Sequence, residues 1–212
     1  DGYSTPLLRS YLTALSLDGG DTTVTYNGKV QTGNWIPSAE YNSEQVLGND
    51  IVGKRNAGTY ELDLGGLYST QQGYDLSVSN GTLTINKAQA TVTANSDQIT
   101  YNGTEQSVSG CTVGGLVNDE DASVPTGVTT SGGKGTNAGS YTLTASGTDG
   151  NYELTFVDGT LTINKAKATV TANSNTTTYN GSEQGVSGFT VDGLVNDEDE
   201  SVLSGVTTSG GK

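Results

Sequence analysis

Two acidic clusters are the first residues in this sequence that point to binding chemistry. The first cluster is Asp119–Asp121 and the second is Asp197–Glu200, and the six candidate residues are Asp119, Glu120, Asp121, Asp197, Glu198 and Asp199. Calcium takes several oxygen ligands, which makes these residues candidates for a calcium site. Neither cluster has the alternating spacing or the central glycine of a calcium-binding loop, so the alternative is a solvated turn. We expect no other metal or cofactor.

The residues around the first cluster also predict its local structure. Asn118 is a residue type that caps helices, and the acidic residues after it favour the positive end of a helix dipole. We therefore predict one short helical turn over Asn118–Val124, capped by Asn118.

Aromatic residues are the other candidates for a binding site. Trp35 is the single tryptophan, and we take it as the ligand candidate because an exposed indole can stack on a sugar. Three tyrosines each precede Asn-Gly: Tyr26, Tyr101 and Tyr179. Their repetition at equivalent places indicates packing, with the ring in a core and the hydroxyl bonded at its rim.

Catalysis is not expected. The chain has no histidine and no glycine-rich phosphate loop followed by a helix, so the usual general base and phosphate site are missing. A pair of carboxylates could act on glycosides, but the acidic residues cluster in repeated turns. Cys111 aligns with Phe189 of a later repeat, which predicts a small buried hydrophobic side chain, and the alternative is a reactive thiol.

The composition excludes several classes of partner. The 212 residues carry a net charge of −14, and a strongly acidic surface disfavours nucleic acid and anionic membranes. No run of about 18 apolar residues occurs, which predicts no membrane insertion. The sequence starts without Met or a signal peptide, so we expect it to be a piece of a longer or processed chain.

The candidate residues are separated by short segments of alternating hydrophobicity. In Thr160–Ala172, apolar and polar residues alternate with period two, the pattern of a strand with one buried face. Asp158-Gly159 and Asn80-Gly81 join two such runs, which predicts two-residue hairpins. The predicted strands of the repeat are Ala88–Ala94, Ile99–Tyr101, Ser107–Val113, Gly127–Ser131, Ser140–Ala145 and the hairpin Tyr152–Asn164.

The sequence repeats itself. Thr-Tyr-Asn-Gly begins at residues 25, 100 and 178, and the last two copies are 78 residues apart. Thr84–Lys134 and Thr162–Lys212 are identical at 40 of 51 positions. A period this long indicates a tandem array of small domains. We divide the chain into a leader (residues 1–12), a divergent first module (residues 13–87), a second module (residues 88–165) and an incomplete third module (residues 166–212), which the period extends to about residue 243.

These patterns predict an all-β protein made of small β-sandwich modules with an immunoglobulin-like or β-grasp-like topology. Each module has at most one short helical turn. The junctions Asn86-Lys87-Ala88 and Asn164-Lys165-Ala166 contain no Gly, Pro or Ser. We therefore expect little bending between modules and an extended rod.

Three motifs resemble the tandem MBG/YDG-type repeats of large bacterial surface adhesins. They are Thr-Tyr-Asn-Gly at 100–103 and 178–181, Asn-Ala-Gly-Ser-Tyr at 137–141, and the stretch Asp158–Ala166. Many members of this family carry Thr-Tyr-Asp-Gly, so the asparagine is a mild departure. The leader, with Asp1-Gly2-Tyr3, resembles the segment that joins an upstream β-helix to the first repeat in filamentous haemagglutinin-like proteins exported by two-partner secretion.

The resemblance implies an extracellular, bacterial cell-surface location and a role in adhesion or biofilm formation. We therefore expect a structural stalk or spacer segment of a secreted adhesin or an extracellular filament. Its partners would be neighbouring modules of the same or another copy, and host or matrix glycans or proteins. The alternatives are a glycan- or matrix-binding module that uses Trp35, and a subunit of a head-to-tail fibre formed by strand exchange.

Overall fold

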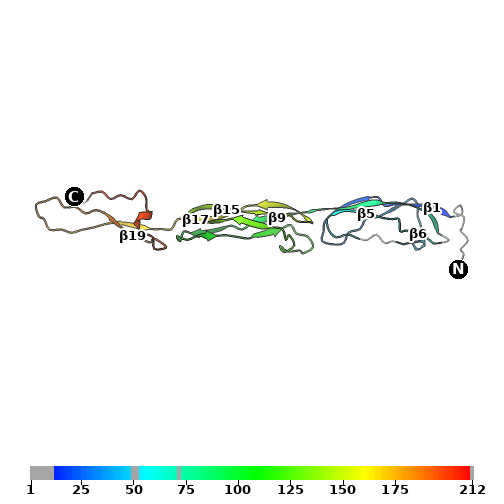
Figure 1. Cartoon of the computed structure of the whole chain (residues 1–212), viewed down its shortest axis with the longest axis horizontal. Coiled ribbons are helices and arrows are strands. Elements are labelled where there is room, and N and C mark those ends of the chain that lie inside the picture. The colour runs from blue at the N-terminus through cyan, green and yellow to red at the C-terminus, as the bar shows by residue number, and fades with distance from the viewer. Residues whose placement is uncertain (1–11, 49–52, 71–72, 211–212) are drawn as a thin grey trace. The chain divides into compact units, whose positions relative to one another are not determined.

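The computed structural model describes residues 12–48, 53–70 and 73–210. The predicted leader lies outside this range except for Leu12. Strands dominate the described part of the chain (Figure 1), and the predicted all-β class is confirmed. Helical structure in that part consists of two 3₁₀ turns, η2 (Ser43–Gln45) and η3 (Glu200–Val202). No helix within the described ranges is long and apolar enough to span a bilayer.

The first module contains two three-stranded sheets, with the orders β3-β1-β7 and β2-β8-β5. In the first sheet β1 runs parallel to β7, and in the second β2 runs parallel to β8 while β5 is antiparallel to it. A short antiparallel pair, β4 and β6, is the remaining pair of strands in the described residues of this module. Their bounds are β1 (Thr13–Asp18), β2 (Asp21–Thr25), β3 (Ile36–Pro37), β4 (Val46–Leu47), β5 (Gly58–Leu62), β6 (Tyr68–Ser69), β7 (Tyr74–Ser79) and β8 (Gly81–Asn86).

Alternation along these strands decides which side chains are buried. On β8, Leu83 and Ile85 are at most 2% exposed, whereas Thr84 between them is only half-buried. On β1, Leu15 and Leu17 are buried in the same way and pack with Leu64. Burying one face of each strand removes apolar surface from water, and this is the main force holding the two sheets together.

The second module has a four-stranded sheet in the order β10-β17-β15-β13 and a three-stranded sheet in the order β12-β9-β16. β9 has the bounds that the alternation predicts, and every second residue along it is buried. The predicted strand Ser107–Val113 is two shorter strands, β11 and β12. The bounds are β9 (Ala88–Ala94), β10 (Asp97–Thr100), β11 (Gln106–Ser107), β12 (Cys111–Gly114), β13 (Thr129–Gly132), β14 (Lys134–Gly135), β15 (Gly139–Ser146), β16 (Tyr152–Val157) and β17 (Gly159–Asn164).

The predicted hairpins at Asp158-Gly159 and Asn80-Gly81 are wrong. β16 and β17 belong to different sheets, and so do β7 and β8. Neither glycine has a positive φ. A Cβ on Gly159 would lie 2.1 Å from the carbonyl oxygen of Asn95, and one on Gly81 would lie 2.1 Å from that of Gly19. Glycine is needed here because the chain passes close to another backbone as it changes sheets.

The third module contains one strand pair, β18 (Thr169–Ala172) with β19 (Phe189–Asp192), in its described residues. They run antiparallel, with Val170 opposite Val191. The stretches equivalent to β10 and β13 are not strands in this copy. Those two strands pair with β17 and β15 in the second module.

The chain divides into two compact units. The first comprises Asp1–Thr91, Val113–Val128 and Gly147–Thr155, and the second comprises Val92–Thr112, Thr129–Ser146 and Phe156–Lys212. The boundary between the first and second modules lies inside the first unit, and we call its contacts the first junction. The boundary between the second and third modules lies inside the second unit, and we call its contacts the second junction.

Candidate functional site

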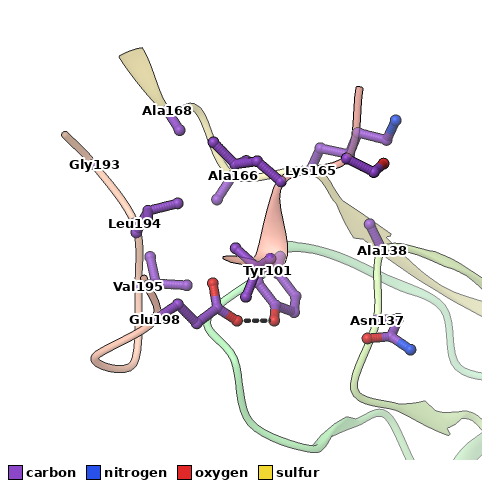
Figure 2. Close-up of a pocket in the computed structure, with 13 residues that line it drawn as sticks. Tyr101, Asn137, Ala138, Lys165, Ala166, Ala168, Gly193, Leu194, Val195 and Glu198 are labelled. Atoms are coloured by element: carbon purple, nitrogen blue, oxygen red, sulfur yellow. Dashed lines mark hydrogen bonds between the residues drawn. The ribbon is translucent and has the colours of Figure 1, made fainter. Parts of the chain in front are cut away.

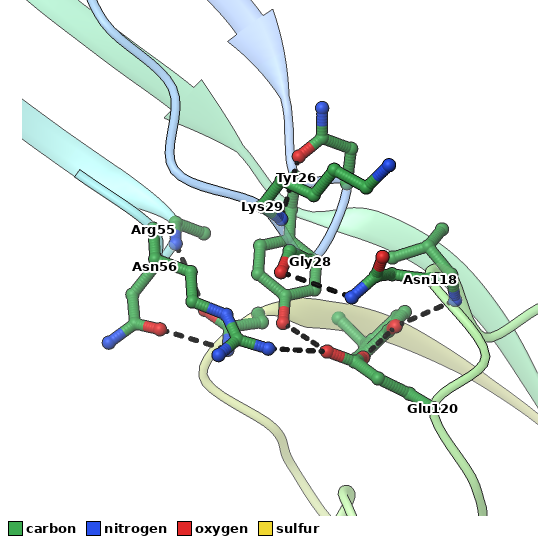
Figure 3. A network of polar contacts seen from close by, with 12 residues as sticks. Tyr26, Gly28, Lys29, Arg55, Asn56, Asn118 and Glu120 are labelled. Atoms are coloured by element: carbon green, nitrogen blue, oxygen red, sulfur yellow. Dashed lines mark hydrogen bonds and ion pairs between the residues drawn. The ribbon is translucent and has the colours of Figure 1, made fainter. Parts of the chain in front are cut away.

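A glutamate held by two tyrosines is the centre of the first junction (Figure 3). The hydroxyl of Tyr26 donates to Oε1 of Glu120 at 2.6 Å, and that of Tyr152 donates to Oε2 at 2.5 Å. The guanidinium of Arg55 lies 3.6 Å from Oε1. Tyr26 and Arg55 come from the first module, whereas Glu120 and Tyr152 come from the second. We call the contact between Tyr26 and Glu120 the tyrosine–glutamate clasp.

The two tyrosine rings carry the hydrophobic core across the first junction. Tyr26 and Tyr152 meet edge to face, with ring centroids 5.4 Å apart and an angle of 80° between the ring planes. Both side chains are at most 3% exposed. The other buried members of this cluster come from both modules: Leu62, Leu83, Ile85, Ala88 and Ala90. The first junction is therefore a shared core and not a flexible linker.

Burial and the carboxylate together change the acidity of these tyrosines. Burial is the larger cause and the hydrogen bond to Glu120 the second, and they raise the pKa of Tyr152 to about 12. The same two causes raise the pKa of Tyr26 above its usual range. Both hydroxyls thus stay protonated at neutral pH, as a donor to an ionised carboxylate must.

A backbone loop beside the clasp fits closely against the next module. Gly28 has a φ of +73°, and a Cβ on it would lie 2.5 Å from Cβ of Asn118. The side-chain amide of Asn118 donates to the carbonyl oxygen of Gly28 at 3.4 Å. Glycine at this position therefore allows both the left-handed backbone and the close approach.

The predicted helical turn at Asn118–Val124, capped by Asn118, is wrong. Asn118 and Asp119 have φ values of 55° and 57°, which lie in the left-handed region. Asp119 would be the first residue of that turn, and its left-handed φ is incompatible with a right-handed helix. The residue that caps a turn here is Asp121, which accepts from the backbone N–H and the hydroxyl of Ser123, and these two bonds lower the pKa of its carboxyl.

Two further contacts join the modules at a distance from the clasp. The side-chain carbonyl of Asn151 accepts from the backbone N–H of Ala57 at 2.9 Å. The ammonium of Lys87, in the junction sequence itself, donates to the backbone carbonyl of Asp149 at 2.7 Å. Contacts at several separate points oppose rotation about the connecting strand.

The second junction repeats the clasp with the equivalent residues (Figure 2). The hydroxyl of Tyr101 donates to Oε1 of Glu198, and this bond is the main cause that raises the pKa of Tyr101. The amide of Asn196 donates to the carbonyl oxygen of Gly103 at 3.1 Å. Gly103 has a φ of +76°, and a Cβ on it would lie 2.4 Å from Cβ of Asn196.

The other candidate residues from the sequence lie elsewhere. Trp35 is half-buried against the core of the first module, and its indole N–H donates to the hydroxyl of Tyr41 at 3.1 Å. Asp199 accepts from the backbone N–H of Ser201, as Asp121 does from Ser123. In the described ranges, no three His, Cys, Asp or Glu side chains converge on a point that could hold a metal. Cys111 is half-buried on β12.

Sequence reasoning treated Glu120 and Glu198 as members of acidic clusters and missed their partners. The missed signal is a pairing of motifs between successive modules: Tyr-Asn-Gly at 26–28 is paired with Asn-Asp-Glu at 118–120, and Tyr-Asn-Gly at 101–103 with Asn-Asp-Glu at 196–198. Tyr26 and Tyr101 were predicted to pack with a bonded hydroxyl. The sequence did not predict that the hydroxyl of each tyrosine donates to a glutamate of the next module.

A comparison with protein families decides what kind of module this is. Residues 90–162 match the family described as MBG domain (YGX type). The second module is an MBG-type repeat. The matched MBG segment contains Tyr101, Glu120 and Tyr152, and therefore residues of both junctions. No curated protein and no solved structure matches the chain.

Proposed function

We propose that this protein is a stalk or spacer segment of a secreted bacterial surface adhesin or extracellular filament. The observation that carries the proposal is the recurrence of the tyrosine–glutamate clasp at both junctions. A contact that repeats with the sequence period is a way to fix each module on the next. MBG-type repeats are typical of secreted surface proteins, and the match to residues 90–162 supports this setting.

The junction chemistry suits a segment that must resist bending. A flexible linker leaves neighbouring domains free to reorient, whereas a shared apolar core and bonds at separate points hold them. At the first junction the core residues Tyr26 and Ala88 are at most 5% exposed. Such a segment would act by extending away from the cell surface and displaying a distal binding region.

The charge of the chain fits an extracellular spacer. A net charge of −14 over 212 residues keeps copies apart in solution and limits adventitious contact with anionic surfaces. Neighbouring modules would then be the main partners, because the clasp offers a specific contact that overall charge does not.

Two measurements test the stalk. Small-angle scattering should give a radius of gyration well above the ~17 Å expected for 212 residues packed as one domain. Spin labels at Thr23→Cys and Thr155→Cys, which lie on the two sides of the first junction within the first compact unit, should give a narrow distance distribution in a Cys111→Ser background, and Glu120→Ala should broaden it. A compact particle, or a distribution that is already broad in the parent protein, would contradict the proposal.

One observation favours a second candidate, a glycan- or matrix-binding module. Trp35 and Tyr41 line a surface cavity together with Val46 and Leu67. An aromatic pair beside a cavity is suited to stacking on a sugar ring. Glycan-array binding that Trp35→Ala abolishes and Trp35→Phe retains would support this function. The absence of binding would contradict it and leave the stalk as the proposed function.

A further inference from the structure

The first and last strands of the first module lie side by side and run in the same direction. β1 pairs in parallel with β7, and after both strands change sheets β2 pairs in parallel with β8. In both sheets each residue pairs with the residue 61 places later, from Thr13 with Tyr74 to Thr25 with Asn86. We call this double pairing the terminal ladder. Its two strands are the first and the last that the chain forms in this module.

Side-chain and backbone bonds hold the terminal ladder together where it changes sheets. The backbone N–H of Gly19 donates to the carbonyl oxygen of Ser79 at 2.9 Å. The hydroxyl of Ser79 donates to Oδ1 of Asp18 at 3.0 Å. Just beyond, Oδ1 of Asp21 accepts from the backbone N–H of Thr82 at 3.1 Å and from its hydroxyl at 2.7 Å. The two strands therefore stay bonded to each other through the crossing.

The second module repeats this arrangement between β10 and β17, which also pair in parallel. Oγ of Ser96 accepts from the backbone N–H of Thr160 at 3.0 Å, and Ser96 stands where Asp21 stands in the first module. The backbone N–H of Tyr101 extends the pairing by donating to the carbonyl oxygen of Asn164 at 2.8 Å, and the equivalent bond of the first module has the same length. The parallel ladder thus belongs to the repeat and not to one divergent copy.

The direction of pairing decides how such a ladder responds to tension. When the first and last strands of a module are parallel neighbours, pulling on the two ends of the module drives the strands past each other in opposite directions. The evenly spaced hydrogen bonds of a parallel pair then share the force and must break together. Pulling across the strands at one end of the ladder loads a single bond, and the bonds break one after another. Leu83 and Ile85 on β8 are at most 2% exposed, so one face of the ladder is closed to water that competes for its bonds.

We propose that the terminal ladder is a mechanical clamp that bears tension along the chain and must rupture before the module can extend. The inference rests on the proposed stalk function, because a segment that displays a binding region is pulled whenever that region holds its target. It adds resistance to force to the role of a spacer. Extension and strength remain separate properties, since a chain can be long and stiff and still unfold at low force.

The first test pulls the first module in two directions within the full chain, by optical tweezers with DNA handles on cysteines. Thr13→Cys with Asn86→Cys places the handles at opposite ends of the ladder, and Thr25→Cys with Asn86→Cys places them at the same end. All three positions are exposed, and both proteins carry Cys111→Ser. At equal loading rate we expect a mean unfolding force about twofold or more higher for the opposite-end pair, because forced rupture follows the unfolding rate.

The length of each rupture event identifies the module that unfolds. Release of the chain between Thr13 and Asn86 should lengthen the tether by about 200 Å, which is the extended length of this segment less that of the ladder. Equal forces in the two directions, for events of the expected length, would overturn the proposal.

A matched pair of substitutions tests the bonds of the ladder itself. Asp21→Ala removes the acceptor for Thr82, whereas Asp63→Ala removes an acceptor that bonds only the nearby backbone N–H of Gly65. Both aspartates are exposed. At constant force between residues 13 and 86, we expect Asp21→Ala to shorten the lifetime of the folded module about tenfold, because hydrogen bonds to a charged group are lost. Asp63→Ala should change it less than about twofold. Equal lifetimes of the two variants would show that bonds between β2 and β8 do not bear the force.

The clamp and the stalk can fail separately. Equal forces in the two directions, together with a large radius of gyration and narrow spin-label distances, would overturn the clamp and leave the stalk function standing. A compact particle whose first module still resists force in one direction more than in the other would contradict the stalk and support the clamp.

Discussion

The hydroxyl of Tyr26 lies 2.6 Å from Oε1 of Glu120, although 94 residues separate the two in the sequence. Glu120 stands inside an acidic run, yet its side chain is only 9% exposed. Tyr101 and Glu198 make the same contact at the second junction. Each pair joins a tyrosine of one module to a turn of the next, so an isolated module lacks this bond.

Loss of the clasp should destabilise the first junction. Tyr26→Phe removes a hydrogen bond to an ionised carboxylate, and we expect it to lower the free energy of unfolding by about 1.5–3 kcal/mol. Urea unfolding followed by the fluorescence of Trp35 measures this, because Trp35 lies in the first module. Tyr179→Phe is the matched control: this side chain is 90% exposed, and its change should stay within about 0.5 kcal/mol. Equal effects of the two variants would show that the clasp adds no stability.

The three equivalent glycines separate backbone strain from module docking. Gly103→Ala and Gly181→Ala both place a side chain at a positive φ, at a cost of about 1–2 kcal/mol. A Cβ on Gly103 would also lie 2.4 Å from Asn196, whereas one on Gly181 has nothing within 4 Å. We therefore expect Gly103→Ala to cost about 1–3 kcal/mol more in urea unfolding. Gly28→Ala should resemble Gly103→Ala, and a cost equal to that of Gly181→Ala would contradict the docking.

Local pattern was enough to predict individual strands but not their arrangement. The alternation of β9 predicted its bounds, because a half-buried strand needs an apolar residue at every second position. Asp158-Gly159 has the sequence signature of a hairpin turn. In the structure Gly159 packs against the backbone of Asn95, which is remote in sequence, and the chain changes sheets here instead. A pattern confined to neighbouring residues cannot contain such a contact.

The site was missed for a related reason. Glu120 is flanked by Asp119 and Asp121, which are exposed, so the run reads as a solvated turn. The role of Glu120 depends on Tyr26, which is remote in sequence.

Calcium should have little effect on stability. Both oxygens of Glu120 accept hydrogen bonds from tyrosines, and Asp121 accepts two from Ser123. A calcium ion would have to displace these donors before it could bind. We expect calcium to shift the melting temperature by no more than sodium chloride of equal ionic strength does. A large, saturable rise at micromolar calcium that Asp119→Asn or Asp197→Asn removes would instead support a calcium site.

Stability should fall at alkaline pH because of Tyr152. Its pKa is about 12 in the folded protein, against about 10 for a tyrosine in an unfolded chain. The folded state therefore holds this proton more tightly, so the contribution is fully present below about pH 10 and is lost as the pH rises toward about 12. Urea unfolding at a series of pH values from 9 to about 11.5, with tyrosinate absorbance measured in parallel, should show this loss. Tyr152→Phe should flatten the pH dependence, and Tyr179→Phe should leave it intact. If the two variants give the same pH profile as the parent protein, the proton on Tyr152 does not contribute to folding.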